Sequence, residues 1–245
     1  MSTNKSIYIK MTPQLHPDTL PFLQELTMNN NRPWFNDHKD RWLAIKADFE
    51  VFTQALIDEM VKYDDTLVGL TAKNSVYRIY RDTRFSADKT PYKTHIACFL
   101  SSWGPKNSGV PGYYFQIGTE EAYGLKGTCN LGGGIFMPTP EALNAIRQEI
   151  FYCTDEFLAI MNEPSYKRYF GSEFFTMKKL QRVPKGYPAD WERADLLKYK
   201  DYTTSYTMPD KFIGSEKLFE EVLKVWRASV PLNRFVQRAM EDVRQ

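Results

Sequence analysis

The stretch from residue 76 to residue 137 alternates strand-like segments with turn-forming ones. Its strand-like segments are rich in aromatic and β-branched residues and cover residues 76–82, 94–102, 113–118 and about 125–136. The turns hold Gly, Pro, Asn and Ser, and no helix fits between the last three segments. Strands joined without a crossover helix pair in antiparallel fashion. We therefore predict a mostly antiparallel sheet of about four to six strands, with a candidate further strand near 201–206.

Helical periodicity lies on both sides of this stretch. Asn31 can cap a long helix, because Pro33 then falls in the first turn, where a missing N–H costs nothing. Thr139-Pro140-Glu141 starts a later helix, since it joins a capping hydroxyl, an N-terminal proline and an acid at the positive end of the helix dipole. The predicted helices are a short one with Leu20, Leu23 and Leu26 on one face and longer ones at 31–62, 139–164 and 215–243.

Strands flanked by blocks of helices predict an α+β fold, in which N-terminal and C-terminal helices pack the sheet. A chain of 245 residues is long enough for one large domain or two small ones. It shows no repeat, no low-complexity segment and no obvious linker. We therefore expect a loose N-terminus over residues 1–14 and a single domain over residues 15–245.

Composition narrows the class of protein. The three cysteines, Cys98, Cys129 and Cys153, form no C-x-x-C, which argues against a disulfide framework and against a cysteine-rich zinc site. Cys98 and Cys129 fall in strand-like apolar runs and are interpreted as small buried side chains. No apolar run approaches the ~20 residues needed to span a bilayer, and the first ten residues lack an apolar signal core. We expect a soluble, cytoplasmic protein with no membrane partner.

Positive charge is concentrated in one place. Residues 73–93 contain six Lys or Arg against two Asp, a local charge of +4, whereas the whole chain carries +2. So small a net charge does not argue for nucleic acid by itself. The cluster must be neutralised either by an anionic ligand or by acidic residues elsewhere in the fold.

The residues of this cluster suit anion binding. Arginine forms paired hydrogen bonds to phosphate or carboxylate, and lysine adds a point charge. In a strand, Arg78 and Arg81 lie on opposite faces, so we expect the strand to end near Arg81 and a turn to follow it. Asp82 can orient an arginine, and Tyr92 can stack a ring. The predicted ligand-binding residues of the cluster are Arg78, Arg81, Asp82, Arg84, Lys89, Tyr92 and Lys93.

The same residues carry a resemblance. The stretch R-I-Y-R-D-T-R-F-S-A-D-K-T-P-Y-K resembles the signature of a family of bacterial and fungal proteins of unknown function, which reads R-x-x-R-D-x-R-F, then Asp or Asn with Lys, then Tyr. The matching residues are Arg78, Arg81, Asp82, Arg84, Phe85, Asp88, Lys89 and Tyr92. Segments N-R-P-W-F, G-Y-Y-F-Q-I, G-G-G-I-F-M-P and V-P-K-G-Y-P also resemble the family, so the resemblance extends over about residues 15–240. It implies a site and no particular activity, cofactor or substrate.

Weaker candidates lie nearby. Gly133 and Gly134, between a strand and the helix that starts at Thr139, would let a ligand approach the backbone or, alternatively, mark a bulge or a close packing contact. His95 and Asp88 are candidate proton-transfer residues, and a structural hydrogen bond is the simpler role for His95. No metal site and no cofactor are indicated, because neither a phosphate-binding glycine loop nor a metal-ligand spacing is present.

Three functions remain open from the sequence. The first is binding of an anionic small molecule, with or without catalysis. The second is binding of single-stranded nucleic acid, because cations alternate with Tyr and Phe on strands. The third is a structural or protein-interaction domain whose arginines form internal salt bridges. Whether the chain is an enzyme is left undecided.

Overall fold

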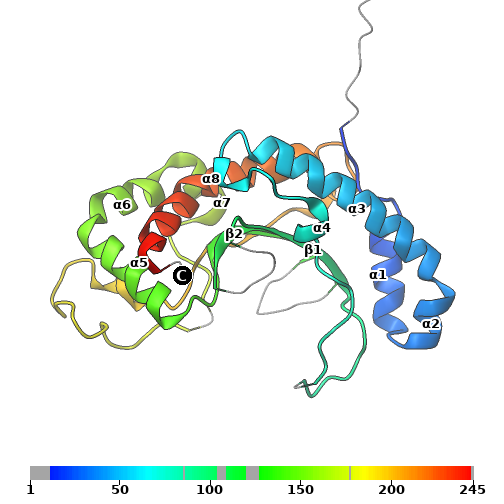
Figure 1. Ribbon diagram of the computed structural model, residues 1–245, viewed down its shortest axis with the longest axis horizontal. Helices are drawn as coiled ribbons and strands as arrows, with labels where there is room; N and C mark the ends of the chain where they lie inside the picture. The colour runs from blue at the N-terminus through cyan, green and yellow to red at the C-terminus, as the bar shows by residue number, and fades with distance from the viewer. Residues whose placement is uncertain (1–11, 85, 104–108, 120–126, 177, 244–245) are drawn as a thin grey trace, which may run out of the picture.

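The computed structural model describes residues 12–84, 86–103, 109–119, 127–176 and 178–243. An antiparallel sheet of five strands packed by helices confirms the predicted α+β fold (Figure 1). Most of the expected loose N-terminus, together with Phe85 and the start of the predicted 125–136 strand, lies outside the described residues. No described helix combines the length and the apolar character needed to cross a bilayer.

The strands follow one another in space in chain order. Each neighbouring pair is antiparallel, and the last two strands both pair with the third. The candidate strand near 201–206 is therefore present as two short strands. The five are β1 (His95–Leu100), β2 (Pro111–Gly118), β3 (Cys129–Ile135), β4 (Tyr202–Thr203) and β5 (Tyr206–Thr207).

The helices agree with prediction in place and differ in length. The predicted 31–62 helix breaks at His38, whose ring stacks on Trp34 and whose Nδ1 donates to the Trp34 carbonyl at 2.8 Å. The predicted 139–164 helix breaks at Cys153, which lies outside the helical region with φ −113° and ψ 40°. The helices are α1 (Thr19–Met28), α2 (Arg32–Asp37), α3 (Lys39–Met60), α4 (Ala72–Ser75), α5 (Pro140–Tyr152), α6 (Thr154–Asn162), α7 (Pro164–Phe170) and α8 (Leu218–Ala239).

Local signals at the helix starts were read correctly. The Asn31 side chain accepts from the Trp34 N–H at 3.0 Å, and the Thr139 hydroxyl accepts from the Ala142 N–H at 3.2 Å. The first predicted strand, in contrast, is not a regular strand. Residues 76–82 follow α4 directly and make only the isolated bridges of Val76 with Cys98 and of Tyr80 with Tyr92.

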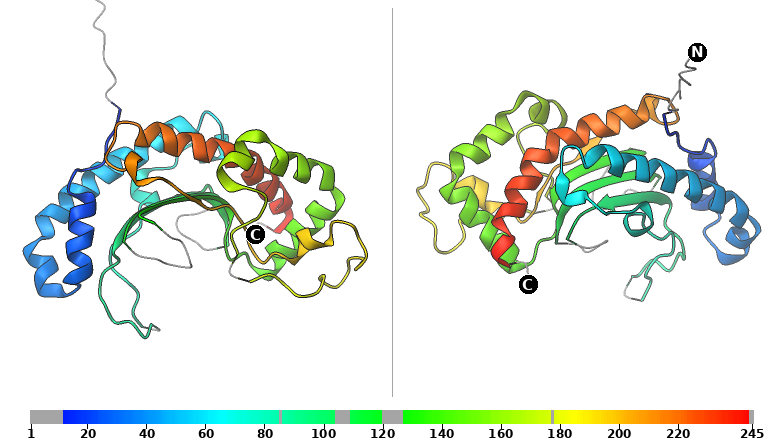
Figure 2. Two further views of the ribbon diagram at one scale, coloured as in Figure 1. Left: turned by 180° about the vertical axis from the view of Figure 1, so that it is seen from behind. Right: turned by 45° about the horizontal axis from the view of Figure 1, so that its top comes forward.

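Helices α3 and α8 cover one face of the sheet (Figure 2). Phe115 of β2 stacks on Phe49 and Phe52 of α3, with 5.9 Å between ring centroids in each pair. Trp226 of α8 packs edge-on against Phe115, and its indole N–H donates to the Tyr114 carbonyl at 3.1 Å. Cys98 and Cys129 are buried, as predicted, and burial raises the pKa of Cys98 to about 12. This side of the sheet is an aromatic core rather than a site.

Arg41 ties α3 to α1, and we expect this tie to depend on pH. Its guanidinium donates to both Asp18 and Glu25, and these hydrogen bonds lower the pKa of each carboxyl. Because each carboxyl has a lower pKa in the folded protein than in the unfolded chain, its interaction with Arg41 stabilises the fold near neutral pH. This stabilisation is lost as the pH falls through the folded-state pKa. Arg41→Ala should lower the melting temperature by about 1–3 °C near neutral pH, since partly exposed ion pairs contribute little. Melting curves of the two proteins should converge as the pH falls through these lowered pKa values; a constant difference would contradict this account.

Candidate functional site

The predicted cluster lies on a projecting hairpin, which we call the basic ribbon (residues 76–94). It leaves the edge of β1 and projects from the sheet on the side away from α3 and α8 (Figures 1 and 2). The Lys93 N–H donates to the Ile79 carbonyl at 2.8 Å, and the Arg81 N–H donates to the Pro91 carbonyl at 3.0 Å. Ile79 is buried, whereas most described side chains of the tip, residues 82–90, are exposed. The ribbon carries five Lys or Arg against two Asp, a net charge of +3, and much of this charge lies on exposed side chains.

Tyr92 anchors the ribbon to α2. Its ring is 3% exposed and stacks on Phe35, with 4.0 Å between centroids and 18° between planes. The Asn30 side chain donates to the Tyr92 carbonyl at 2.9 Å and accepts from the Tyr92 N–H at 3.1 Å. Burial raises the pKa of Tyr92, and the charge of Arg32 opposes that effect. The fold thus brings the N-R-P-W-F segment and the preceding Asn30 against the ribbon. Asn30 and Tyr92 are 62 positions apart in the chain.

Two arginines of the ribbon are engaged by the ribbon's own acids. Arg84 donates to both carboxylate oxygens of Asp82, at 2.9 Å and 2.7 Å, and lowers the pKa of Asp82 to about 2. Arg81 donates to Asp88 and, at 2.8 Å, to the Thr90 hydroxyl. Hydrogen bonds from Thr90, and then from Arg81, lower the pKa of Asp88. Both acids are therefore carboxylates near neutral pH, and neither can serve there as a proton donor.

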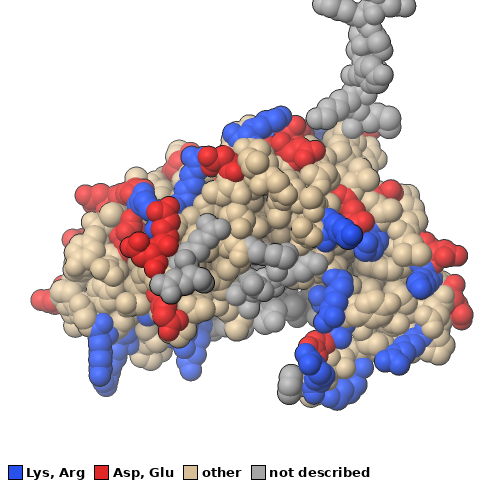
Figure 3. Space-filling view, in the orientation of Figure 1, with Lys and Arg blue, Asp and Glu red and all other residues tan. Residues whose placement is uncertain are grey.

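The other cations of the ribbon are Arg78, Lys89 and Lys93. Arg78 is exposed, and no described residue forms an ion pair or a hydrogen bond with its guanidinium. Lys89 donates to the Thr83 carbonyl at 2.9 Å, which leaves its charge uncompensated. The Lys93 ammonium lies 5.1 Å from the centre of the Tyr77 ring. Figure 3 shows Lys and Arg gathered on this projection, with few acidic atoms between them.

The sheet face opposite α8 carries a polar row that the sequence analysis missed. Tyr114 and Gln116 alternate with the core residues of β2 and so point away from α8. The Tyr114 hydroxyl donates to Gln116 Oε1 at 2.6 Å, and Tyr77 of the ribbon packs edge-on against Tyr114. Asn130 lies opposite Gln116 and accepts from the Thr207 hydroxyl at 3.0 Å. Gln and Asn inside otherwise apolar strands were the available signal, since buried amides need partners.

Gly133 and Gly134 lie apart from the ribbon, because β1 and β2 separate β3 from it. A Cβ on Gly133 would collide with Ser229 of α8. Gly134 has φ +95°, and its N–H donates to Asn233 Oδ1 of α8 at 3.0 Å. A ligand at these glycines would have to displace α8, so close packing accounts for them.

The remaining candidates are placed as follows. His95 is half-buried at the start of β1, two residues beyond the ribbon's Lys93, and pairs with Gly118 across to β2. Within the described parts of the chain, no three His, Cys, Asp or Glu side chains come together as a metal site would require.

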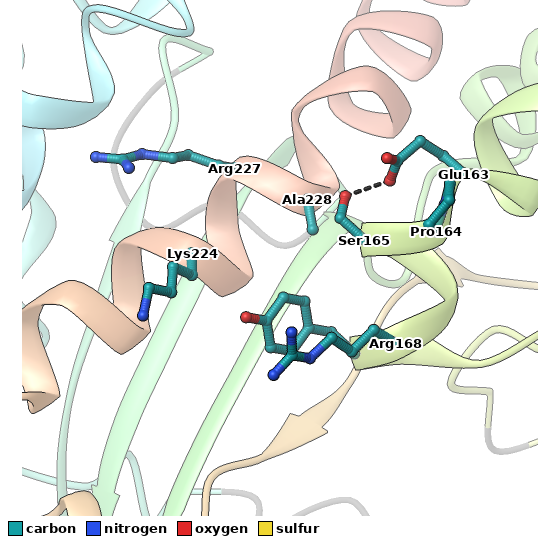
Figure 4. A pocket seen from close by; sticks show the side chains of 8 residues that line it. Glu163, Pro164, Ser165, Arg168, Lys224, Arg227 and Ala228 are labelled. Atoms are coloured by element: carbon teal, nitrogen blue, oxygen red, sulfur yellow. Dashed lines mark hydrogen bonds between the residues drawn. The ribbon is translucent and has the colours of Figure 1, made fainter.

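A groove of about 510 Å³ lies between α7 and α8, away from every predicted site residue (Figure 4). Its polar side chains are already engaged or point apart. Ser165 donates to Glu163, Lys224 donates to Glu221 at 2.7 Å, and Arg227 lies over the Tyr63 ring at 4.4 Å. A second groove, of about 490 Å³, lies between α3 and α4. Neither groove gathers convergent groups as a ligand site does.

A family model described as conserved hypothetical protein (DUF2461) matches residues 18–235. The chain belongs to the DUF2461 family. The DUF2461 match includes the basic ribbon, the α2 segment that anchors it and the polar row. No curated protein and no solved structure matches the chain. Membership in DUF2461 agrees with the resemblance seen in the sequence and brings no activity with it.

Proposed function

We propose that the basic ribbon binds a small molecule that carries a phosphate or a carboxylate. One observation carries the proposal: Arg78 and Lys89 hold exposed charges that form no ion pair with a described acid, on a hairpin fixed to the fold by Tyr92. Uncompensated cations on a fixed backbone are prepared for an anion, because little conformational entropy remains to be lost on binding.

The ribbon offers complementary groups to such a ligand. Arg78 supplies a planar fork for two anionic oxygens, and Lys89 and Lys93 supply point charges. Asp82 and Asp88 hold Arg84 and Arg81 in place, and an incoming phosphate can exchange for either carboxylate. Tyr80, which is 51% exposed and lies beside Tyr92, offers a ring face for a sugar or a base. Should the ligand be transformed, His95 and the carboxylate of Asp88 are the proposed proton-transfer groups.

A thermal-shift screen of nucleotides, sugar phosphates, carboxylates and inorganic phosphate tests the proposal. A ligand at about 100 times its dissociation constant stabilises a fold by about 2.7 kcal/mol. We expect a hit to raise the melting temperature of wild type by about 5–10 °C. Arg78→Ala combined with Lys89→Ala should melt like wild type without ligand and lose most of that rise. Lys62→Ala, which removes an exposed charge after α3, is the matched control. Absence of any hit, or an equal rise in the double variant, would reject the proposal.

Arg81→Ala tests the structural alternative separately. Arg81 bridges Asp88 and Thr90 across the tip of the ribbon, so this side chain contributes to the fold as well as to the charge. Under the ligand proposal, the variant should fold with a melting temperature within about 4 °C of wild type, because the pair is partly exposed. An unfolded or strongly destabilised Arg81→Ala protein would instead assign the arginines to internal salt bridges.

A further inference from the structure

A second basic surface lies at the other end of the molecule, in segment 171–200. This segment contains seven Lys or Arg and four Asp or Glu, a net charge of +3. Residues 73–93 carry +4, so the rest of the chain sums to −5. In the orientation of Figure 1, the segment and the ribbon both reach below the sheet, at opposite ends of it, and Figure 3 shows blue side chains projecting from both.

Four cations of this surface are unneutralised. Among the described residues, three basic side chains of the segment pair with acids: Lys179 with Glu173, Arg193 with Glu192 and Lys198 with Asp195. The other four are exposed and have no ion-pair partner in the described structure; they are Lys178, Arg182, Lys185 and Lys200. Like charges held on one irregular segment repel one another, and a polyanion would relieve that repulsion.

Aromatic rings belong to the same part of the fold as these cations. Phe151 packs edge-on against Tyr187 and Trp191 of the segment, with centroids 5.4 Å and 4.9 Å away. Tyr152 follows Phe151 at the end of α5 and is 74% exposed. An exposed ring supported by packed rings next to unpaired cations is the combination that binds single-stranded nucleic acid, through phosphate contacts and base stacking.

We propose that the surface formed by residues 178–200 and Tyr152 binds single-stranded nucleic acid. Single-stranded nucleic acid has phosphates at regular intervals and a flat face on every base. It therefore fits both the spaced cations and the exposed ring of Tyr152. A small anion does not account for four separate exposed cations. The proposal is independent of the small-molecule ligand proposed for the ribbon.

Fluorescence anisotropy with labelled oligo-dT and oligo-U of about 20 nucleotides tests this surface. We expect K178E/R182E/K185E to weaken binding at least tenfold at about 50 mM salt. The log–log salt slope should fall in magnitude by about 2, because three phosphate contacts are lost. Tyr152→Ala should weaken binding about tenfold through lost stacking. The control K62E/K217E/K224E has the same charge change near α3 and on α8, and it should bind within about twofold of wild type.

Three outcomes would overturn the inference. Wild type that binds no oligonucleotide at low salt would remove the partner. An equal loss of affinity in the control variant would show that the effect depends on the overall charge of the protein and not on this surface. Loss of binding in an R78E/K89E ribbon variant, with full binding by K178E/R182E/K185E, would move the nucleic acid to the ribbon. That last result would leave an anion site on the ribbon intact, so the two proposals fail separately. Circular dichroism and melting curves must show that every variant is folded.

Discussion

Replacing Gly134 by alanine is expected to destabilise the protein by about 2–5 kcal/mol, with a melting temperature about 10 °C lower. A left-handed backbone with φ +95° costs an alanine about 1–2 kcal/mol. The new methyl would also collide with the Tyr202 carbonyl and lie 3.2 Å from Leu232 Cδ2. Overpacking of a tight interior adds about 1–3 kcal/mol. Urea unfolding followed by circular dichroism measures the loss directly.

Gly171→Ala is the matched control for this result. Gly171 also has a positive φ, +71°, but a Cβ there would meet no atom within 4 Å. Its substitution should therefore cost only the backbone strain, about 1–3 kcal/mol, because φ +71° with ψ −144° is a conformation that almost only glycine adopts. The difference between the two variants isolates the collision between β3 and its neighbours. A Gly134→Ala protein that melts like wild type but loses ligand binding would show that Gly134 serves ligand binding and not packing.

Tyr92→Ala should cost about 3 kcal/mol and free the ribbon from α2. The ring is buried against Phe35, so its removal leaves a cavity at the point where the ribbon meets the fold. Trypsin should then cleave at Arg78, Arg81 or Arg84 much faster than in wild type, since local opening exposes these sites. The small-anion affinity proposed for the ribbon should fall in parallel.

Tyr92→Phe separates the ring from the hydroxyl. It keeps the stack on Phe35 and the backbone bonds to Asn30, so its melting temperature and cleavage rate should stay near those of wild type. Cleavage of the Tyr92→Ala ribbon at the wild-type rate would show that the hairpin holds its shape without this anchor.

The sheet was predictable because its strands are consecutive. Antiparallel pairing between neighbours in the chain requires only period and turn signals, and β1 to β3 supply both. Residues 76–82 have the composition of a strand but sit where the chain leaves α4 and departs from the edge of β1, so only isolated bridges form. Helix breaks at His38 and Cys153 were invisible to periodicity, because the apolar spacing continues through them.

The concentration of positive charge was predictable from the sequence, but the pairing of its charged groups was not. Charge density alone marked the ribbon, since +4 within 21 residues stands out against +2 overall. The shape of the tip determines which cation pairs with which acid. Asp82 forms its ion pair with Arg84, two positions away, and not with the adjacent Arg81. The Asn30–Tyr92 bonds join distant segments and have no local signature. Gln116 and Asn130 are polar residues in buried strands, which indicates a need for hydrogen-bond partners. A search for the spacing of apolar residues does not detect them.

We expect the distribution of charge to give the molecule a large electric dipole, although its net charge is small. Two segments that sum to +7 reach to one side of the sheet, and the remaining residues carry −5. Near a negatively charged surface the protein should turn its ribbon side inward before contact, which increases the rate of encounter at low ionic strength. On a cation-exchange column it should be retained more strongly than a protein with an evenly spread charge of +2, and the excess retention should decline as salt screens the dipole.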